Sequence, residues 1–202
     1  ETMEKIYTAV HDREGIENTV ATLERVKERA AELEITQLAV PTTTGQTALA
    51  CAETMPEMQT IAAVTMHAID TDIYVTRRGE KVMAKDPQIM RKARQAGVRF
   101  YTGVHPFKGA VTNALNERFG GYAPHDLIGD MLREFFSTGT KVAIESTLMA
   151  ADGGLLDMSR DVIALGGYRG GVDTALVVRP AFSYRLFDLK VREIIAFPRD
   201  KA

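Results

Sequence analysis

The chain has 202 residues, of which 45% are hydrophobic and 26% charged, and its formal net charge is −2 at pH 7. A chain of this length and composition folds as one soluble domain, and its slightly negative charge argues against a nucleic-acid-binding role. No apolar run approaches the roughly 20 residues of a membrane span, and the first residues lack the apolar core of a signal peptide. We therefore expect one cytoplasmic domain over residues 1–202, with neither a membrane nor nucleic acid as a partner.

Strands and helices alternate in the predicted secondary structure. The hydrophobic pattern predicts strands at residues 6–10, 38–40, 61–66, 98–101, 141–144, 162–165, 175–178 and 194–197. Capping residues, prolines and glycines predict helices at residues 19–33, 46–55, 87–96, 124–138 and 145–151, with a short helix that ends near residue 115. This order predicts an α/β fold with a mostly parallel sheet covered on both faces, in which the closely spaced last strands are antiparallel at one side.

The most informative segment is an apolar strand that runs into a threonine-rich turn, Val40-Pro41-Thr42-Thr43-Thr44-Gly45-Gln46-Thr47. Gly45 permits a positive φ or the close approach of a ligand, and the first N–H groups of the next helix point into the turn. A simple helix cap needs one hydroxyl residue, and this turn has four. We therefore expect a phosphate site, with a merely capped turn as the alternative. Its residues are Thr42, Thr43, Thr44, Gly45, Gln46 and Thr47. The Walker pattern is absent, which argues against an NTPase.

A second glycine cluster, Gly166-Gly167-Tyr168-Arg169-Gly170-Gly171-Val172-Asp173-Thr174, joins two apolar strands. Its glycines allow close backbone approach, and a guanidinium is a bidentate partner for an anion. We expect a ligand loop to which Gly167, Arg169, Asp173 and Thr174 contribute. A glycine-rich hairpin that only turns the chain is the alternative.

Two histidines, His67 and His105, follow predicted strand ends, so they should share one edge of the sheet with the threonine turn. Histidine can transfer a proton to or from a substrate, although each of these two could instead make a structural hydrogen bond. Glu145 and Asp152 lie seven residues apart and are either paired acids or capping residues. The candidate catalytic residues are therefore His67, His105 and Asp152, with no reaction assigned.

Metal, disulfide and reactive-thiol sites are not expected. No group of histidines or carboxylates has metal-ligand spacing, and Cys51 is the only cysteine, so one chain cannot form a disulfide. Cys51 lies in an alanine-rich segment and is interpreted as a packed, inert thiol. Arg29 and the neighbouring basic residues are interpreted as the solvated face of the first helix.

Several segments together resemble a stand-alone family of proteins similar to the C-terminal α/β domain of pyruvate kinase. The threonine turn resembles the loop with which that kinase domain grips a regulatory sugar phosphate. The family pattern is also found in Glu17-Asn18-Thr19, Arg118-Phe119-Gly120-Gly121, Met149-Ala150-Ala151-Asp152, Ala164-Leu165-Gly166-Gly167, Asp173-Thr174-Ala175 and Asp188-Leu189-Lys190-Val191-Arg192-Glu193-Ile194-Ile195.

The resemblance implies a three-layer α/β/α domain with a mixed sheet and no pyruvate kinase activity. It also implies that the domain binds flavin mononucleotide (FMN), with the phosphate in the threonine turn and His105 among the candidate ligand-binding residues. We expect a small phosphorylated ligand and a homo-oligomer. The alternatives are an enzyme acting on a phosphorylated metabolite, or a regulatory module that senses a sugar phosphate.

Overall fold

The fold was taken from a computed structural model, which describes all residues except 1–2, 4, 66–72, 76–80, 84–85 and 108–109. Its main strands are β1 (Ala9–Arg13), β2 (Gln37–Pro41), β3 (Thr60–Thr65), β6 (Arg99–Thr102), β7 (Val162–Gly166), β8 (Thr174–Arg179) and β9 (Lys190–Asp200). Its helices are α1 (Thr19–Glu32), α2 (Gln46–Thr54), α3 (Pro87–Gln95), α4 (Ala110–Phe119), α5 (Pro124–Phe135) and α6 (Thr138–Asp152), with 3-10 turns η1 (Ile16–Asn18) and η2 (Ser183–Asp188). Strands β4 (Ile73–Val75) and β5 (Lys81–Met83) form a separate antiparallel pair.

The main sheet has seven strands in the order β1-β9-β8-β7-β2-β3-β6. Strands β2, β3, β6 and β7 are mutually parallel, β8 is antiparallel to both of its neighbours, and β1 is parallel to β9. Only β8 therefore opposes the common direction. The expected antiparallel pairing of the last strands is confirmed, and β1 lies outside them as the edge strand.

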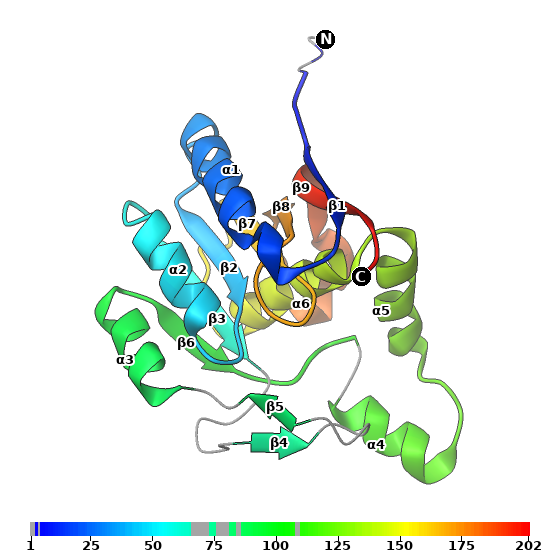
Figure 1. The fold of residues 1–202 in the computed structure, drawn as a ribbon. Helices are drawn as coiled ribbons and strands as arrows, with labels where there is room; N and C mark the ends of the chain where they lie inside the picture. The colour runs from blue at the N-terminus through cyan, green and yellow to red at the C-terminus, as the bar shows by residue number, and fades with distance from the viewer. Residues whose placement is uncertain (1–2, 4, 66–72, 76–80, 84–85, 108–109) are drawn as a thin grey trace.

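Helices cover both faces of the sheet, as Figure 1 shows, with α1 and α2 on one side and α6 on the other. The alternation of side chains along β2 explains this arrangement, because successive residues point to opposite faces. Leu38 and Val40 pack in the core beneath α1 and α2, whereas Ala39 packs in the core beneath α6. The expected three-layer α/β/α class is confirmed.

The predicted strand at residues 141–144 is wrong, because this segment is the second turn of α6. The predicted end of the preceding helix at Gly139 is also wrong, since Gly139 lies in the first turn of α6. A new helix begins here because the Ser137 hydroxyl accepts a hydrogen bond from the Thr140 N–H at 2.9 Å. Nearly all of α6 is buried, so it lacks the one-sided apolar pattern by which a surface helix is recognised.

The first strand lies at Ala9–Arg13 rather than at residues 6–10. Its position is set by parallel pairing with β9, in which Ala9 lies opposite Ala196 and Arg13 opposite Asp200. An edge strand with one open side tolerates polar residues, and this segment has several. The hydrophobic pattern therefore did not predict the strand at these positions.

Arg29 is buried, which corrects its interpretation as part of a solvated helix face. Its guanidinium binds both carboxylate oxygens of Glu193 on β9 at 2.8 Å, and it also contacts Glu32 at 2.7 Å. The spacing of residues along α1 did not show this, because the partner lies 164 residues away in the sequence. The bidentate pair fastens α1 to the sheet.

Replacing Glu193 by Gln should lower the free energy of unfolding by about 3 kcal/mol, because it leaves the buried Arg29 guanidinium without its main counter-charge. Urea denaturation measures the change. The matched control is Glu32→Gln, whose carboxylate contacts the same arginine but is mostly exposed, and which should cost less than about 1 kcal/mol. Equal losses in the two variants would contradict the role given to Glu193.

Candidate functional site

The candidate site lies along the edge of the sheet where the parallel strands end. The threonine turn follows β2, and β2 has β7 on one side and β3 on the other. Since neighbouring strands lie about 4.8 Å apart, the loop after β7 starts beside the threonine turn, and the segment after β6 starts roughly 10 Å away. The expectation that the threonine turn and the His105 segment share one edge is confirmed. His67 lies outside the described residues.

The threonine turn is held by two of its own hydroxyl groups. Thr42 Oγ1 accepts the Gly45 N–H at 3.0 Å, and Thr44 Oγ1 accepts the Gln46 N–H at 3.3 Å. Gly45 has a φ of +94°, which favours glycine, and a Cβ there would lie 2.7 Å from the sulfur of Met90. The turn therefore requires glycine both for its backbone conformation and for its packing against α3.

Two further hydroxyls and two N–H groups of this segment have no acceptor or donor within the described chain. Thr43 and Thr47 are half-buried and their hydroxyls make no hydrogen bond there, and the N–H groups of Thr47 and Ala48 donate to none of these residues. In two other helices a side chain caps the first turn. The Asp86 carboxylate accepts the N–H groups of Gln88 and Ile89 in α3, and the Ser137 hydroxyl accepts the Thr140 N–H in α6. The start of α2 thus offers donors to an anion.

The loop between β7 and β8 is closed by a hydrogen bond from the Asp173 N–H to the Gly166 carbonyl at 3.0 Å. Arg169 is exposed and has a φ of +51°, an uncommon conformation for a residue with a side chain. Its guanidinium lies over the ring of Tyr168, 5.3 Å from the centroid. Gly167 packs against the backbone of Gly171, because a Cβ would lie 2.6 Å from that carbonyl oxygen.

Asp173 and Thr174 face the interior, where they bind other protein groups. The Asp173 carboxylate accepts hydrogen bonds from the N–H groups of Gly15 and Tyr168 and from the Thr174 hydroxyl. Burial raises the pKa of Asp173 above its ordinary value, and the negative charge of the nearby Glu14 raises it further. Both side chains hold the loop after β7 against the rest of the edge.

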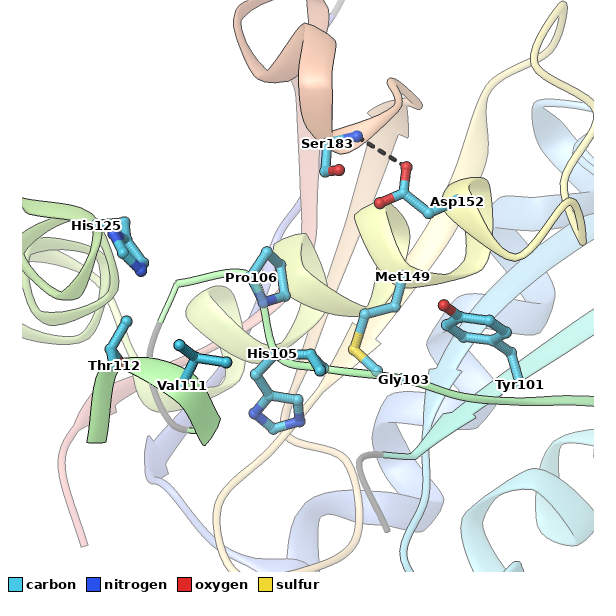
Figure 2. A pocket seen from close by; sticks show the side chains of 11 residues that line it. Tyr101, Gly103, His105, Pro106, Val111, Thr112, His125, Met149, Asp152 and Ser183 are labelled. Atoms are coloured by element: carbon cyan, nitrogen blue, oxygen red, sulfur yellow. Dashed lines mark hydrogen bonds between the residues drawn. The ribbon is translucent and has the colours of Figure 1, made fainter. Parts of the chain in front are cut away.

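A separate cavity of about 430 Å³ lies on the α6 side of the sheet (Figure 2). It is lined by Tyr101, Gly103, Val104, His105, Pro106, Val111, Thr112, His125, Met149, Asp152 and Ser183. Asp152, the last residue of α6, accepts a hydrogen bond from the Ser183 N–H at 2.9 Å. The structure therefore brings His105 and Asp152 to one cavity, and no described residue of the threonine turn lines it.

Behind His105 lies a buried ion pair that the sequence interpretation missed. The Lys141 amino group contacts the Glu145 carboxylate one helical turn away, and their side chains are 1% and 2% exposed. Glu145 also accepts the Phe107 N–H at 2.9 Å, and one of its oxygens lies 3.7 Å from His105 Nδ1. The i,i+4 spacing of Lys141 and Glu145 signals such a pair only on a helix, and this segment was predicted to begin as a strand.

Within the described residues, the histidines, cysteine and carboxylates form no group of three that could hold a metal ion. No helix in this part of the chain is long and apolar enough to cross a membrane. Cys51 is fully buried, and burial raises the pKa of its thiol to about 12, as in a packed, unreactive cysteine.

Asp173→Asn should become more stable relative to the parent protein as pH rises. An ordinary Asp ionises near 3.8, so the unfolded chain loses this proton before the folded protein does. Folding therefore becomes less favourable as pH rises from about 3.8 through the raised pKa, and Asn has no such penalty. Urea denaturation of both proteins between about pH 3.5 and 8 measures the difference. A constant difference over this range would contradict the shift.

A comparison with known families identifies the domain. The model of the pyruvate kinase alpha/beta domain matches residues 20–178, which run from the first turn of α1 to near the end of β8. Strands β1 and β9, which pair with each other at one side of the sheet, lie outside the match. Because the match covers more than half of the chain, the protein belongs to the pyruvate kinase alpha/beta domain family.

Proposed function

We propose that this domain binds a small phosphorylated molecule through the threonine turn, and that FMN is this ligand. The observation that carries the proposal is that the four threonines differ in their hydrogen bonds: two hold the turn, and two make no hydrogen bond within the described chain. Thr42 and Thr44 shape the turn, whereas the hydroxyls of Thr43 and Thr47 and the N–H groups of Thr47 and Ala48 keep their hydrogen-bonding capacity. Uncharged donors at a helix N-terminus are well suited to a phosphate.

The loop after β7 supports the same proposal. It follows the strand next to β2, so Arg169 belongs to the neighbouring segment of the edge. A left-handed backbone at a residue other than glycine persists where the surroundings impose it, and such residues cluster at ligand sites. We assign Arg169 to the phosphate or to the sugar-like part of the ligand.

FMN is favoured over a smaller phosphate ester by an aromatic side chain near the neighbouring strand end. The end of β7 lies about 4.8 Å from the end of β2, so a mononucleotide with its phosphate in the threonine turn can reach the loop after β7. Tyr168 is half-buried beside the edge and can stack on a ring. Phe107, another aromatic near a strand end, is in the core and cannot.

Fluorescence titration with FMN and with riboflavin tests the phosphate assignment. FMN should bind more tightly because only its phosphate reaches the threonine turn. Thr43→Val and Thr47→Val should each weaken FMN binding tenfold or more, the effect of losing one hydrogen bond to a charged group at ~1.5–3 kcal/mol, and leave riboflavin binding unchanged. Thr54→Val at the far end of α2 is the control. Equal binding of both flavins would reject the assignment, and stabilisation by a sugar phosphate alone would favour the regulatory alternative.

Arg169→Lys should also weaken FMN binding about tenfold, because lysine keeps the charge but loses the planar fork. The matched control is Arg160→Lys, since Arg160 is 63% exposed and precedes β7 at the opposite edge of the sheet. Titration of the two variants side by side is sufficient. If they bind FMN equally well, the loop after β7 does not contact the ligand.

A further inference from the structure

We propose that His105 is the proton-transferring residue of a second site, in which the cavity on the α6 side binds a small carbonyl compound. Described residues of the threonine turn and of the loop after β7 do not line this cavity. The proposal therefore stands apart from FMN binding. It rests on three features: the buried ion pair, the placement of His105 beside it, and the chemistry of the cavity wall.

The Lys141–Glu145 pair is not explained by stability alone. Removing two charges from water is costly, and well-packed apolar residues in place of such a pair are often equally or more stable. Glu145 is 2% exposed, yet its described partners include the Lys141 amino group, the Phe107 N–H and the His105 ring. The Lys141 amino group is its ion-pair partner in the interior. The carboxylate in turn fixes the segment that carries His105.

This arrangement is that of a base held by an orienting acid. His105 Nδ1 lies 3.7 Å from a Glu145 oxygen, and such contacts often tighten when a ligand binds. With Nδ1 turned to the carboxylate, Nε2 is the ring nitrogen suited to accept a proton. The His105 side chain is 28% exposed and lines the cavity, as Figure 2 shows.

The cavity wall indicates the ligand class. Val104, Pro106, Val111 and Met149 are apolar, and no lysine or arginine is among the described lining residues. The apolar side chains suit the carbon skeleton of a small organic molecule. A second histidine, His125 on α5, can donate a hydrogen bond to a carbonyl oxygen in the same cavity.

The proposed proton transfer is balanced. His105 Nε2 takes a proton from the carbon next to the carbonyl, and the electron pair of the broken C–H bond moves into an enolate whose oxygen His125 stabilises. The same proton, or one from solvent, returns to that carbon or to its neighbour. The imidazolium formed in between is stabilised by Glu145. The step needs no oxidant, reductant or further reactant.

Exchange of C–H for C–D in D₂O, followed by proton NMR, tests this step. The probes are dihydroxyacetone, which is uncharged, and pyruvate, which carries one charge. We expect the protein to catalyse exchange of at least one probe, and His105→Gln to slow it 100-fold or more. His11→Gln is the control, because His11 binds Thr22 on α1 and lies outside the cavity. No exchange with either probe, or exchange that His105→Gln leaves unchanged, would overturn the proposal.

The pH profile separates positioning by Glu145 from a merely structural role. Among the described residues, the titratable groups near the His105 ring are Glu145 and Lys141 on α6, with Tyr101, His125 and Asp152 in the cavity wall. Exchange should rise with pH as His105 loses its proton. In Glu145→Gln the midpoint should move to lower pH, because the carboxylate no longer stabilises the imidazolium, and the plateau rate should fall.

A double variant distinguishes the role of Glu145 from a loss of the fold. Lys141→Met combined with Glu145→Gln removes both buried charges together, so it leaves neither of them unpaired. It should fold with a melting temperature near that of the parent and still have the reduced plateau rate of Glu145→Gln. Parental exchange in the folded double variant would overturn the role given to Glu145.

Discussion

The positions of both proposed sites depend on the close approach between the first turn of α6 and the ends of β7 and β8. A Cβ at Gly166 would lie 1.9 Å from the Gly139 carbonyl oxygen, and one at Gly139 would lie 2.1 Å from the Thr174 hydroxyl. Helix and strands can meet at this distance only because both positions are glycine. The contact fixes where α6 starts, and with it the depth at which Lys141 and Glu145 lie. It also holds the loop after β7 at the edge that it shares with the threonine turn.

The same contact explains why one helix start can serve as an anion site and another cannot. At the start of α6, the Glu14 carboxylate accepts the Thr138 N–H, and the Ser137 hydroxyl binds Thr140 and Thr174. The positive end of this helix is thus neutralised from within the protein. Among the described residues, no acidic side chain accepts an N–H group at the start of α2, and the turn supplies donors instead. This difference supports the proposal that an external anion binds at α2.

The sequence predicted those parts of the fold that local patterns determine. The Asp86-Pro87 start of α3 and its end before Gly97 are examples, because the carboxylate caps two N–H groups and Gly97 has a φ of +91°. The start of α6 could not be predicted, since a helix buried on all sides has no polar face to reveal its period. The true length of β9 was also missed, because its first three residues are exposed and two of them are charged.

Prediction of the candidate site had a similar limit. The threonine turn and the loop after β7 could be found because a strand end followed by glycine and hydroxyl residues is a local signal. The contact between His105 and Glu145 was not accessible in this way. These residues lie on different elements, and they meet only because the segment after β6 crosses to the α6 face. The contact between Arg29 and Glu193 was missed because these residues also lie on different elements, 164 residues apart.

Both proposed sites depend on short-range interactions rather than on the net charge of the protein. The protein has a net charge of −2, so it has no general field to attract an anion, and recognition of a phosphate must come from short-range donors. In the proposed phosphate site, hydroxyls and N–H groups would supply this recognition through geometry, and Arg169 would add a single charge beside them. In the cavity, the Lys141–Glu145 pair brings a carboxylate close to His105 while its own net charge is zero. A neutral ligand therefore meets a polarised histidine without strong repulsion or attraction from the buried pair, which suits a site that moves protons.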